Sequence, residues 1–164
     1  MTDVTATGGQ DARDRDEQAR FPGRRRAEGY RQVSLTRTGA GAFEAVNARG
    51  GRVPMGTGTS EDFTPVELLL AAIAGCSSVD VDMLTARRAE PATFEVECSG
   101  VKVDDDEGHH LTDIQVSFTV RFPEGEGGDK ARAMVPRAIE ASRDRLCTVS
   151  RTVALGTPVA MRQE

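Results

Sequence analysis

The chain has 164 residues, of which 38% are hydrophobic and 29% charged, and its formal net charge at pH 7 is −5. These values predict a single globular domain with an ordinary core. The negative charge argues against nucleic acid as a partner, because binding to phosphate needs a basic surface.

The N-terminal residues 1–29 are polar, with few large apolar side chains, and we expect a disordered tail followed by one domain over residues 30–164. The start of the tail has no apolar stretch of the kind that a secretory signal needs. The longest apolar run of the chain, residues 68–76, is much shorter than the roughly twenty residues that cross a bilayer. A cytoplasmic protein without a membrane partner is therefore expected.

Short antiparallel strands are predicted after the tail. Val33 and Leu35 alternate with polar residues, which is typical of a strand. A glycine-rich turn at 39–41 leads to a returning strand at 42–46. A second turn, 49–52, precedes a short strand near Val53. These elements together predict a small meander.

The first long helix is predicted to begin after Thr64. Thr64 is a good N-cap, Pro65 suits the first helical position, and Glu67 completes a capping box. The helix is expected to run to about Arg88, because Pro91 prevents its continuation.

Residues 68–76 of that helix leave no polar stripe for more than two turns. A helix that is apolar all round is normally buried all round, and one sheet covers only one side of it. The other side must be covered by a second helix or a second subunit. Small residues would let another backbone approach closely there: Ala71, Ala72, Ala74 and Gly75.

A hairpin is predicted next, because residues 94–98 and 114–120 alternate between apolar and polar positions, with Cys98 on the inner face. The segment between these strands is acidic and also contains His109 and His110, and it favours a solvated turn over a metal site. A second helix is expected from about Asp129, with a kink or a late start at Pro136. A final strand is predicted at 152–161. This order of elements indicates the α+β class.

The chain contains three cysteines, Cys76, Cys98 and Cys147. An odd count at wide spacing, with no CxxC, does not match a structural disulfide framework. No metal and no organic cofactor are predicted. Each cysteine is compatible with a small buried hydrophobe, and that interpretation is favoured for Cys98.

Two stretches resemble the OsmC/Ohr family. The first, residues 64–76, is similar to the family's pattern of a proline, an acidic residue, a leucine, an alanine-rich turn and then the reactive cysteine, here Cys76. The second, residues 146–151, is similar to the family's Cys-x-Val-Ser around its second cysteine, here Cys147. With the order of elements, the resemblance covers residues 31–161.

The resemblance implies an intertwined homodimer in which antiparallel sheets surround two long central helices and the active sites lie at the subunit interface. It also implies an enzyme that reduces organic hydroperoxides without metal or flavin. Cys76 would attack the peroxide, and Cys147 would resolve the sulfenic acid as a disulfide. A lipoyl-type dithiol would be the reductant.

A thiolate at Cys76 needs a nearby cation, because the helix dipole acts only over the first turn and Cys76 lies about three turns in. The family uses an arginine from the N-terminal strand region, oriented by a glutamate upstream of the cysteine. Arg37 fits best by placement, with Arg49 and Arg52 as alternatives. The glutamate's position is Val66 in this chain, and Glu67, one residue later, is explained equally as a helix cap.

Two functions therefore remain open. The first is a thiol peroxidase that uses Cys76 and Cys147. The second is an OsmC-like dimer with weakened or lost peroxidase chemistry, which binds a small apolar ligand or senses redox state; Val66 motivates this alternative.

Overall fold

A computed structural model describes residues 28–163 of the chain. Most of the predicted N-terminal tail, residues 1–27, lies outside this range. The domain begins with a three-stranded antiparallel sheet in the order β1-β2-β3, formed by β1 (Val33–Gly39), β2 (Ala42–Asn47) and β3 (Arg52–Met55). The predicted meander is therefore confirmed. Its first turn needs Gly41, whose φ of 68° is in the left-handed region that favours glycine.

The long helix α2 (Pro65–Thr85) begins at the predicted capping box. The backbone N–H of Glu67 donates to Thr64 Oγ1 over 3.3 Å, and the N–H of Thr64 donates to Glu67 Oε2 over 2.7 Å. The helix ends three residues before the predicted Arg88. Its buried residues recur every fourth position and form one face: Ile73, Ser77, Val81 and Thr85.

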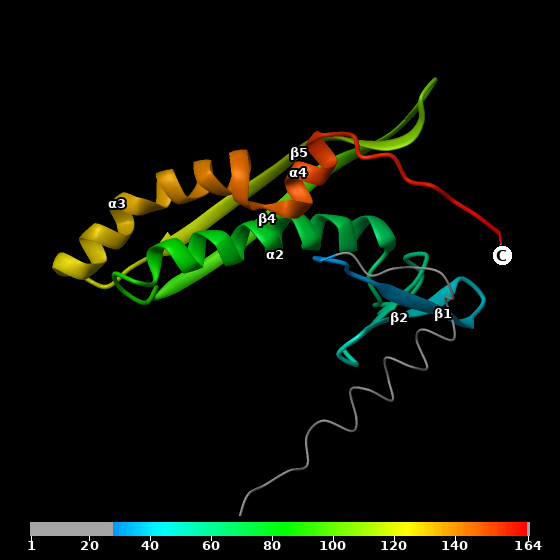
Figure 1. Ribbon diagram of the computed structural model, residues 1–164, viewed down its shortest axis with the longest axis horizontal. Helices are drawn as coiled ribbons and strands as arrows, with labels where there is room; N and C mark the ends of the chain where they lie inside the picture. Colours follow the sequence, from blue (N-terminus) through cyan, green and yellow to red (C-terminus); the bar gives the residue numbers. More distant parts are fainter. Residues whose placement is uncertain (1–27, 164) are drawn as a thin grey trace, which may run out of the picture.

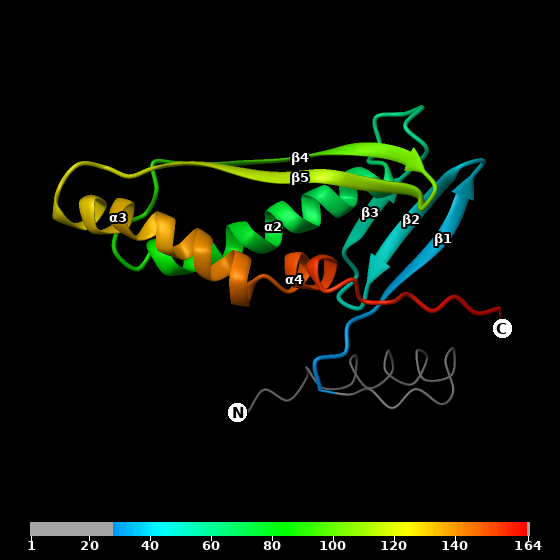
Figure 2. The same cartoon turned by 90° about the horizontal axis from the view of Figure 1, so that it is seen from above.

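A long hairpin of β4 (Thr93–Asp105) and β5 (Gly108–Arg121) supports the helices. Its burial alternates as predicted, so that Phe94 and Phe118 face inward and meet edge to face, with ring centroids 6.5 Å apart. Figures 1 and 2 show α2 and α3 (Glu126–Ala141) packed side by side along this hairpin. The core lies between the hairpin and the helices.

Helix α3 begins three residues earlier than predicted and continues through Pro136. Gly127 and Gly128 near its start have low helix propensity, which is why the sequence predicted a later start. Gly128 is nevertheless required, because a Cβ there would lie 1.8 Å from the carbonyl oxygen of Pro123. The C-terminal end of α3 widens into a π-helical turn, η1 (Ser142–Leu146).

The predicted final strand at 152–161 is wrong. A short helix, α4 (Thr148–Ala154), occupies the first part of this segment, and residues 157–163 carry no assigned secondary structure. The β-branched residues Thr152 and Val153 suggested a strand. The helix forms instead because Cys147 caps it, its sulfur accepting the N–H of Ser150 over 3.3 Å.

The N-terminal sheet has almost no packing with the rest of the described chain and lies at one end of it (Figure 1). Apolar residues on this sheet and along α2 are therefore exposed to solvent in the single chain. On α2 they form a stripe, here named the exposed stripe: Leu69, Ala72, Gly75, Val79 and Met83. Val79 and Met83 are each 58% exposed, which is unusual for a helix of this apolarity.

Helix α2 is also long and apolar enough, by length and composition alone, to cross a membrane. Its most apolar window has a mean hydropathy of 1.6, although only 22% of that window is buried. Core helices of globular proteins pass the same test. The absence of a membrane partner stays a prediction. The exposed stripe is the apolar surface of this helix that the described chain does not cover.

Candidate functional site

Cys76 lies in the middle of α2, at the border between the buried face and the exposed stripe. It is half-buried. The helix fixes its direction: residues one position apart point about 100° apart, so the neighbouring Ser77 faces the core.

Cys147 comes from a distant part of the chain, between η1 and α4, and is fully buried. Three groups surround its sulfur. The Ser77 hydroxyl donates to it over 3.5 Å, the Ser150 N–H donates over 3.3 Å, and the thiol itself donates to Ser150 Oγ over 3.1 Å. The sulfur is thus anchored both to α2 and to the first turn of α4.

The fold brings Cys76 and Cys147 together with a third residue, Asp80. The two sulfurs and a carboxylate oxygen of Asp80 all lie within 4.8 Å of one another. Asp80 is positioned by Ser142, whose hydroxyl donates to Asp80 Oδ2 over 2.8 Å. We refer to Cys76, Asp80 and Cys147 as the thiol–carboxylate cluster.

Asp80 was not among the site residues predicted from the sequence, although its spacing from Cys76 could have indicated it. It stands four residues after Cys76 in the same helix, and side chains at this spacing lie on one face, one turn apart. The position of Cys147 and Ser142 against this turn depends on tertiary packing and has no local signal.

The two thiols differ in acidity. Burial raises the pKa of Cys76, and the neighbouring Cys147 and the Asp80 carboxylate raise it further, while a hydrogen bond from the Val149 backbone opposes them. Burial also raises the pKa of Cys147. Hydrogen bonds from Ser150, whose hydroxyl can rotate to donate once the sulfur is a thiolate, and from Ser77 outweigh this effect, and the net pKa is below the ordinary value. Within one chain, the more accessible thiol is therefore the weaker acid.

The charged residues predicted to assist Cys76 lie elsewhere. Glu67 is exposed at the start of α2 and serves the capping box. Its pKa is lowered by the Thr64 backbone hydrogen bond and then by that of the Thr64 hydroxyl. Arg37 is exposed on β1, and no hydrogen bond or ion pair among residues 28–163 joins it to either thiol.

The two alternative arginines are also on the N-terminal sheet or its turn. Arg52 forms an ion pair with Glu44 of the adjacent strand, and Arg49 is exposed. Neither has a described contact with the cluster. Among the described residues, 28–163, none of the three predicted arginines therefore supplies a cation to Cys76.

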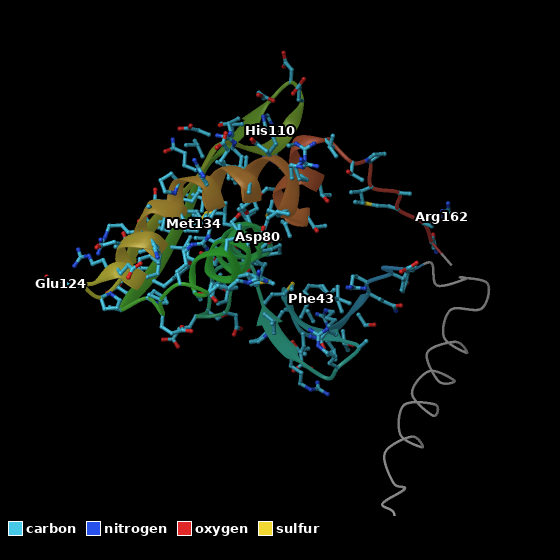
Figure 3. The ribbon with its side chains drawn as sticks, turned by 60° about the vertical axis from the view of Figure 1, so that its left-hand side comes forward. Phe43, Asp80, His110, Glu124, Met134 and Arg162 are labelled. Carbon is cyan, nitrogen blue, oxygen red and sulfur yellow. The ribbon has the colours of Figure 1, made fainter. Side chains whose placement is uncertain are left out.

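Cys98 lies on the half-buried face of β4, as its alternation predicts, and burial raises its pKa. The turn between β4 and β5 is acidic, and both histidines lie at the start of β5, where His109 Nδ1 is 3.3 Å from Asp104 Oδ1. Figure 3 shows His110 near the hairpin tip and Asp80 between the helices. In the part of the chain that the structure describes, only the thiol–carboxylate cluster has the geometry of a metal-ligand group.

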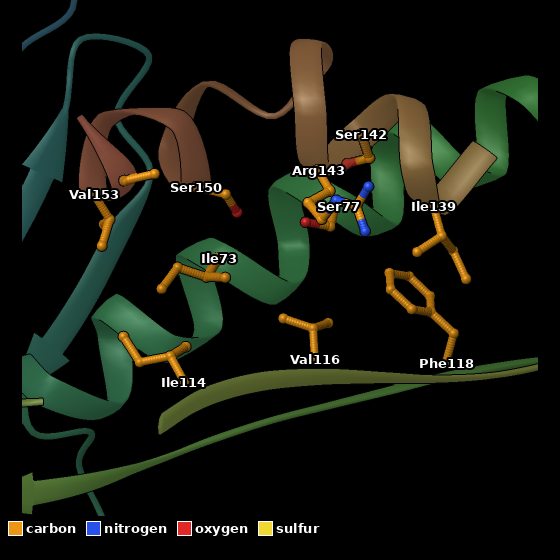
Figure 4. A pocket seen from close by; sticks show the side chains of 11 residues that line it. Ile73, Ser77, Ile114, Val116, Phe118, Ile139, Ser142, Arg143, Ser150 and Val153 are labelled. Carbon is orange, nitrogen blue, oxygen red and sulfur yellow. The ribbon is translucent and has the colours of Figure 1, made fainter. Parts of the chain in front are cut away.

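A cavity of about 340 Å³ lies on the inner side of α2. Figure 4 shows that Ile114, Val116 and Phe118 of β5 form its floor. The helices supply the other walls, which are apolar apart from three serines and an arginine: Ile73, Ser77, Ile139, Ser142, Arg143, Ser150, Val153 and Ala154. Neither sulfur lines the cavity. Ser77 and Ser150 line it, and both are hydrogen-bonded to the Cys147 sulfur.

Comparisons with known proteins identify relatives of the chain. The chain is 32% identical over 133 residues to the uncharacterized protein Rv2923c of Mycobacterium tuberculosis (strain ATCC 25618 / H37Rv), which covers 78% of this chain and 92% of the relative. A protein of Mycobacterium bovis, Mb2948c, matches to the same extent.

Solved structures share the fold. A hypothetical protein from Aquifex aeolicus VF5 superposes with a TM-score of 0.62 at 21% identity, over 78% of this chain and 89% of that one. An OsmC-like protein from Mycoplasma pneumoniae gives a TM-score of 0.60 at 14% identity, over 76% and 87%. The model of the family described as "OsmC-like protein" matches residues 57–162, which include both cysteine motifs. The chain is therefore a member of the OsmC-like protein family.

Proposed function

We propose that the protein is a thiol-dependent peroxidase that reduces organic hydroperoxides through Cys76 and Cys147. The observation that carries this proposal is the proximity of the two sulfurs, within 4.8 Å, although the residues are far apart in sequence. A disulfide brings two sulfurs to about 2.05 Å, so the two side chains must move closer as the bond forms.

The reaction proceeds in two steps. The Cys76 thiolate attacks one peroxide oxygen, an S–O bond forms as the O–O bond breaks, and the leaving alkoxide takes a proton to become the alcohol. The Cys147 thiolate then attacks the sulfur of the resulting sulfenic acid and releases water as the disulfide forms. An external dithiol, of the lipoyl type by resemblance, returns both thiols to the reduced state.

The roles of the two cysteines follow from their surroundings. Cys76 is half-buried and so is the more exposed of the two thiols, whereas Cys147 is fully buried. The lowered pKa of Cys147 suits a resolving nucleophile that must be a thiolate when it attacks. Residues 28–163 of one chain place no cation beside Cys76 to offset the raised pKa of its thiol, so its ionisation needs a cation from elsewhere.

We propose that a second copy of the chain supplies this cation in a homodimer. The exposed stripe on α2 gives the copies an apolar surface to bury, and the small residues Ala72 and Gly75 allow close approach. Arg37 is the proposed cation, because Arg52 is already paired with Glu44 whereas Arg37 has no ion pair among the described residues.

The test is rapid mixing of the reduced full-length protein with a bulky organic hydroperoxide and, separately, with hydrogen peroxide. We expect fast oxidation, a preference for the bulky peroxide, and one intramolecular Cys76–Cys147 disulfide detected by mass spectrometry. Cys98→Ser is the matched control and should behave as the parent protein. Unchanged peroxide consumption in Cys76→Ser would exclude the mechanism.

The alternative function, binding of a small apolar ligand, has one specific observation in its favour, the 340 Å³ cavity behind Cys147. Slow thiol oxidation together with tight binding of an apolar fluorescent probe would favour this alternative. Sedimentation velocity tests the dimer in both cases, since a 17.6 kDa chain should sediment at twice its mass. A chain that is soluble only in detergent would point instead to a membrane.

A further inference from the structure

We infer that the thiol–carboxylate cluster is a three-ligand binding site for a thiophilic divalent cation such as Zn²⁺. The bound cation and the Cys76–Cys147 disulfide exclude each other, because both use the same two sulfurs. This inference does not depend on the peroxidase activity, because it rests only on the donor atoms and their surroundings. The predictions from sequence included no metal site, since they considered the histidines and not Asp80.

The donor atoms have the right chemistry and nearly the right spacing. Two thiolates and one carboxylate are a ligand set that zinc accepts, with bonds of about 2.3 Å to sulfur and about 2.0–2.2 Å to oxygen. Tetrahedral bonds of this length hold two sulfurs roughly 3.8 Å apart. The donors of the cluster already lie within 4.8 Å of one another, so shifts of about 1 Å complete the geometry.

The backbone arrangement is also suitable. Cys76 and Asp80 stand four residues apart on one helix, a spacing that directs two side chains to the same ion. Cys147 approaches from the η1–α4 junction, so the ion would tie α2 to the C-terminal helices. Because Cys76 and Asp80 are only half-buried, the ion can enter from their side, and its fourth coordination position stays open there.

The ligands are held by hydrogen bonds outside the ion's own coordination shell. Ser142 donates to Asp80 Oδ2 and leaves Oδ1 available to a cation. The Ser150 N–H and the Ser77 hydroxyl both point to the Cys147 sulfur. Such outer partners orient ligands and typically strengthen metal binding about 10–100-fold. Two isolated thiols would lack this support.

Binding converts two thiols to thiolates, so it releases protons to solvent while the carboxylate contributes its existing charge. Oxidation of the same two sulfurs to a disulfide removes two of the three ligands. Oxidised protein should therefore lose the site completely, and a bound cation should block oxidation.

The experiment titrates Zn²⁺ into the reduced full-length protein in competition with a chromophoric chelator, and Co²⁺ separately to detect sulfur-to-metal charge transfer. We expect one ion per chain, no binding to the oxidised protein, and protection of Cys76 and Cys147, but not Cys98, from alkylation. Asp80→Asn should weaken binding by roughly tenfold or more, because it removes a direct ligand. Asp82→Asn and Cys98→Ser should match the parent protein.

The comparison of Asp80→Asn with Asp82→Asn distinguishes a three-ligand site from binding by the two thiols alone. If Asp80→Asn binds as tightly as Asp82→Asn, the carboxylate is no ligand and the three-ligand site is wrong. Binding that survives oxidation, or that protects Cys98, overturns it too. The oxidation and protection measurements use the parent protein and remain decisive if a variant fails to fold. Failure of peroxide reduction would leave these results unchanged.

Discussion

The hydroxyl of Ser142 donates a 2.8 Å hydrogen bond to Asp80 Oδ2, and this bond fastens the end of α3 to the turn of α2 that carries Cys76. Ser142 is almost fully buried, at 1% exposure. The bond therefore holds the start of η1, the turn that leads to Cys147, against α2, and it sets the direction of the carboxylate.

Ser142→Ala should destabilise the fold and loosen the cluster. Loss of a buried hydrogen bond to a charged group costs about 1.5–3 kcal/mol, which urea denaturation would measure as a lower midpoint. Thr152→Ala, which removes an exposed hydroxyl bonded to the Thr148 carbonyl, is the control and should cost less. An equal loss in both variants would mean that the Ser142–Asp80 bond contributes nothing specific.

Asp80→Asn should increase the reactivity of Cys76 toward an alkylating agent at neutral pH. Burial is the main cause of the raised pKa of Cys76, but the Asp80 charge also contributes, and its removal lowers the pKa and enlarges the thiolate fraction. A several-fold faster rate and a pH–rate curve displaced to lower pH are expected. Asp82→Asn should leave the curve in place; a displaced curve there would assign the effect to overall charge.

Ser150→Ala should have the opposite effect on Cys147. The Ser150 side chain is the main group that lowers the pKa of Cys147 against the effect of burial, so its removal should raise that pKa. We expect the pH profile for alkylation of Cys147, measured in a Cys76→Ser background to remove coupling between the thiols, to move to higher pH. A profile that does not move would mean that the Ser150 N–H and the Ser77 hydroxyl sustain the thiolate without the Ser150 side chain.

Substitutions at Gly75 should have different effects in a monomer and in a homodimer. A Cβ added there meets nothing within 4 Å in the single chain. In a monomer, Gly75→Ala should therefore stabilise α2 by about 1 kcal/mol through helix propensity. In a homodimer closed across the exposed stripe, Gly75→Leu should shift sedimentation toward the monomer and slow Cys76 oxidation. A stable monomeric parent protein would contradict the pairing.

The capping role of Glu67 can be separated from a catalytic role. Thr64→Ala removes the cap on the Glu67 N–H and should cost about 1 kcal/mol. Glu67→Ala should lower thermal stability above acidic pH while leaving the Cys76 oxidation rate unchanged. Because the folded pKa of Glu67 is lowered, its contribution is present above the pKa of the unfolded chain and disappears as the pH falls through the folded value. A large loss of rate at unchanged stability would restore the catalytic interpretation.

Local patterns predicted the elements whose signals are local. The period-two alternation around Phe94 and Phe118 gave the hairpin, and the Thr64–Glu67 box gave the start of α2. The pairing of Cys76 with Cys147 came from family resemblance, since no local rule joins residues so far apart in sequence. The end of the chain was predicted wrongly because strand propensity at Thr152 and Val153 was outweighed by a cap contributed by Cys147. Asp80 was overlooked although its spacing from Cys76 was visible in the sequence.

The first turn of α4 is held by a sulfur atom, whereas most helices are capped by oxygen. An oxygen cap is chemically inert, but this sulfur is one that oxidants, alkylating agents and thiophilic ions can modify. Any new bond to Cys147 competes with the Ser150 N–H for the same atom. The order of the C-terminal helix is thereby linked to the covalent state of one cysteine, and amide exchange over residues 148–154 would report on it.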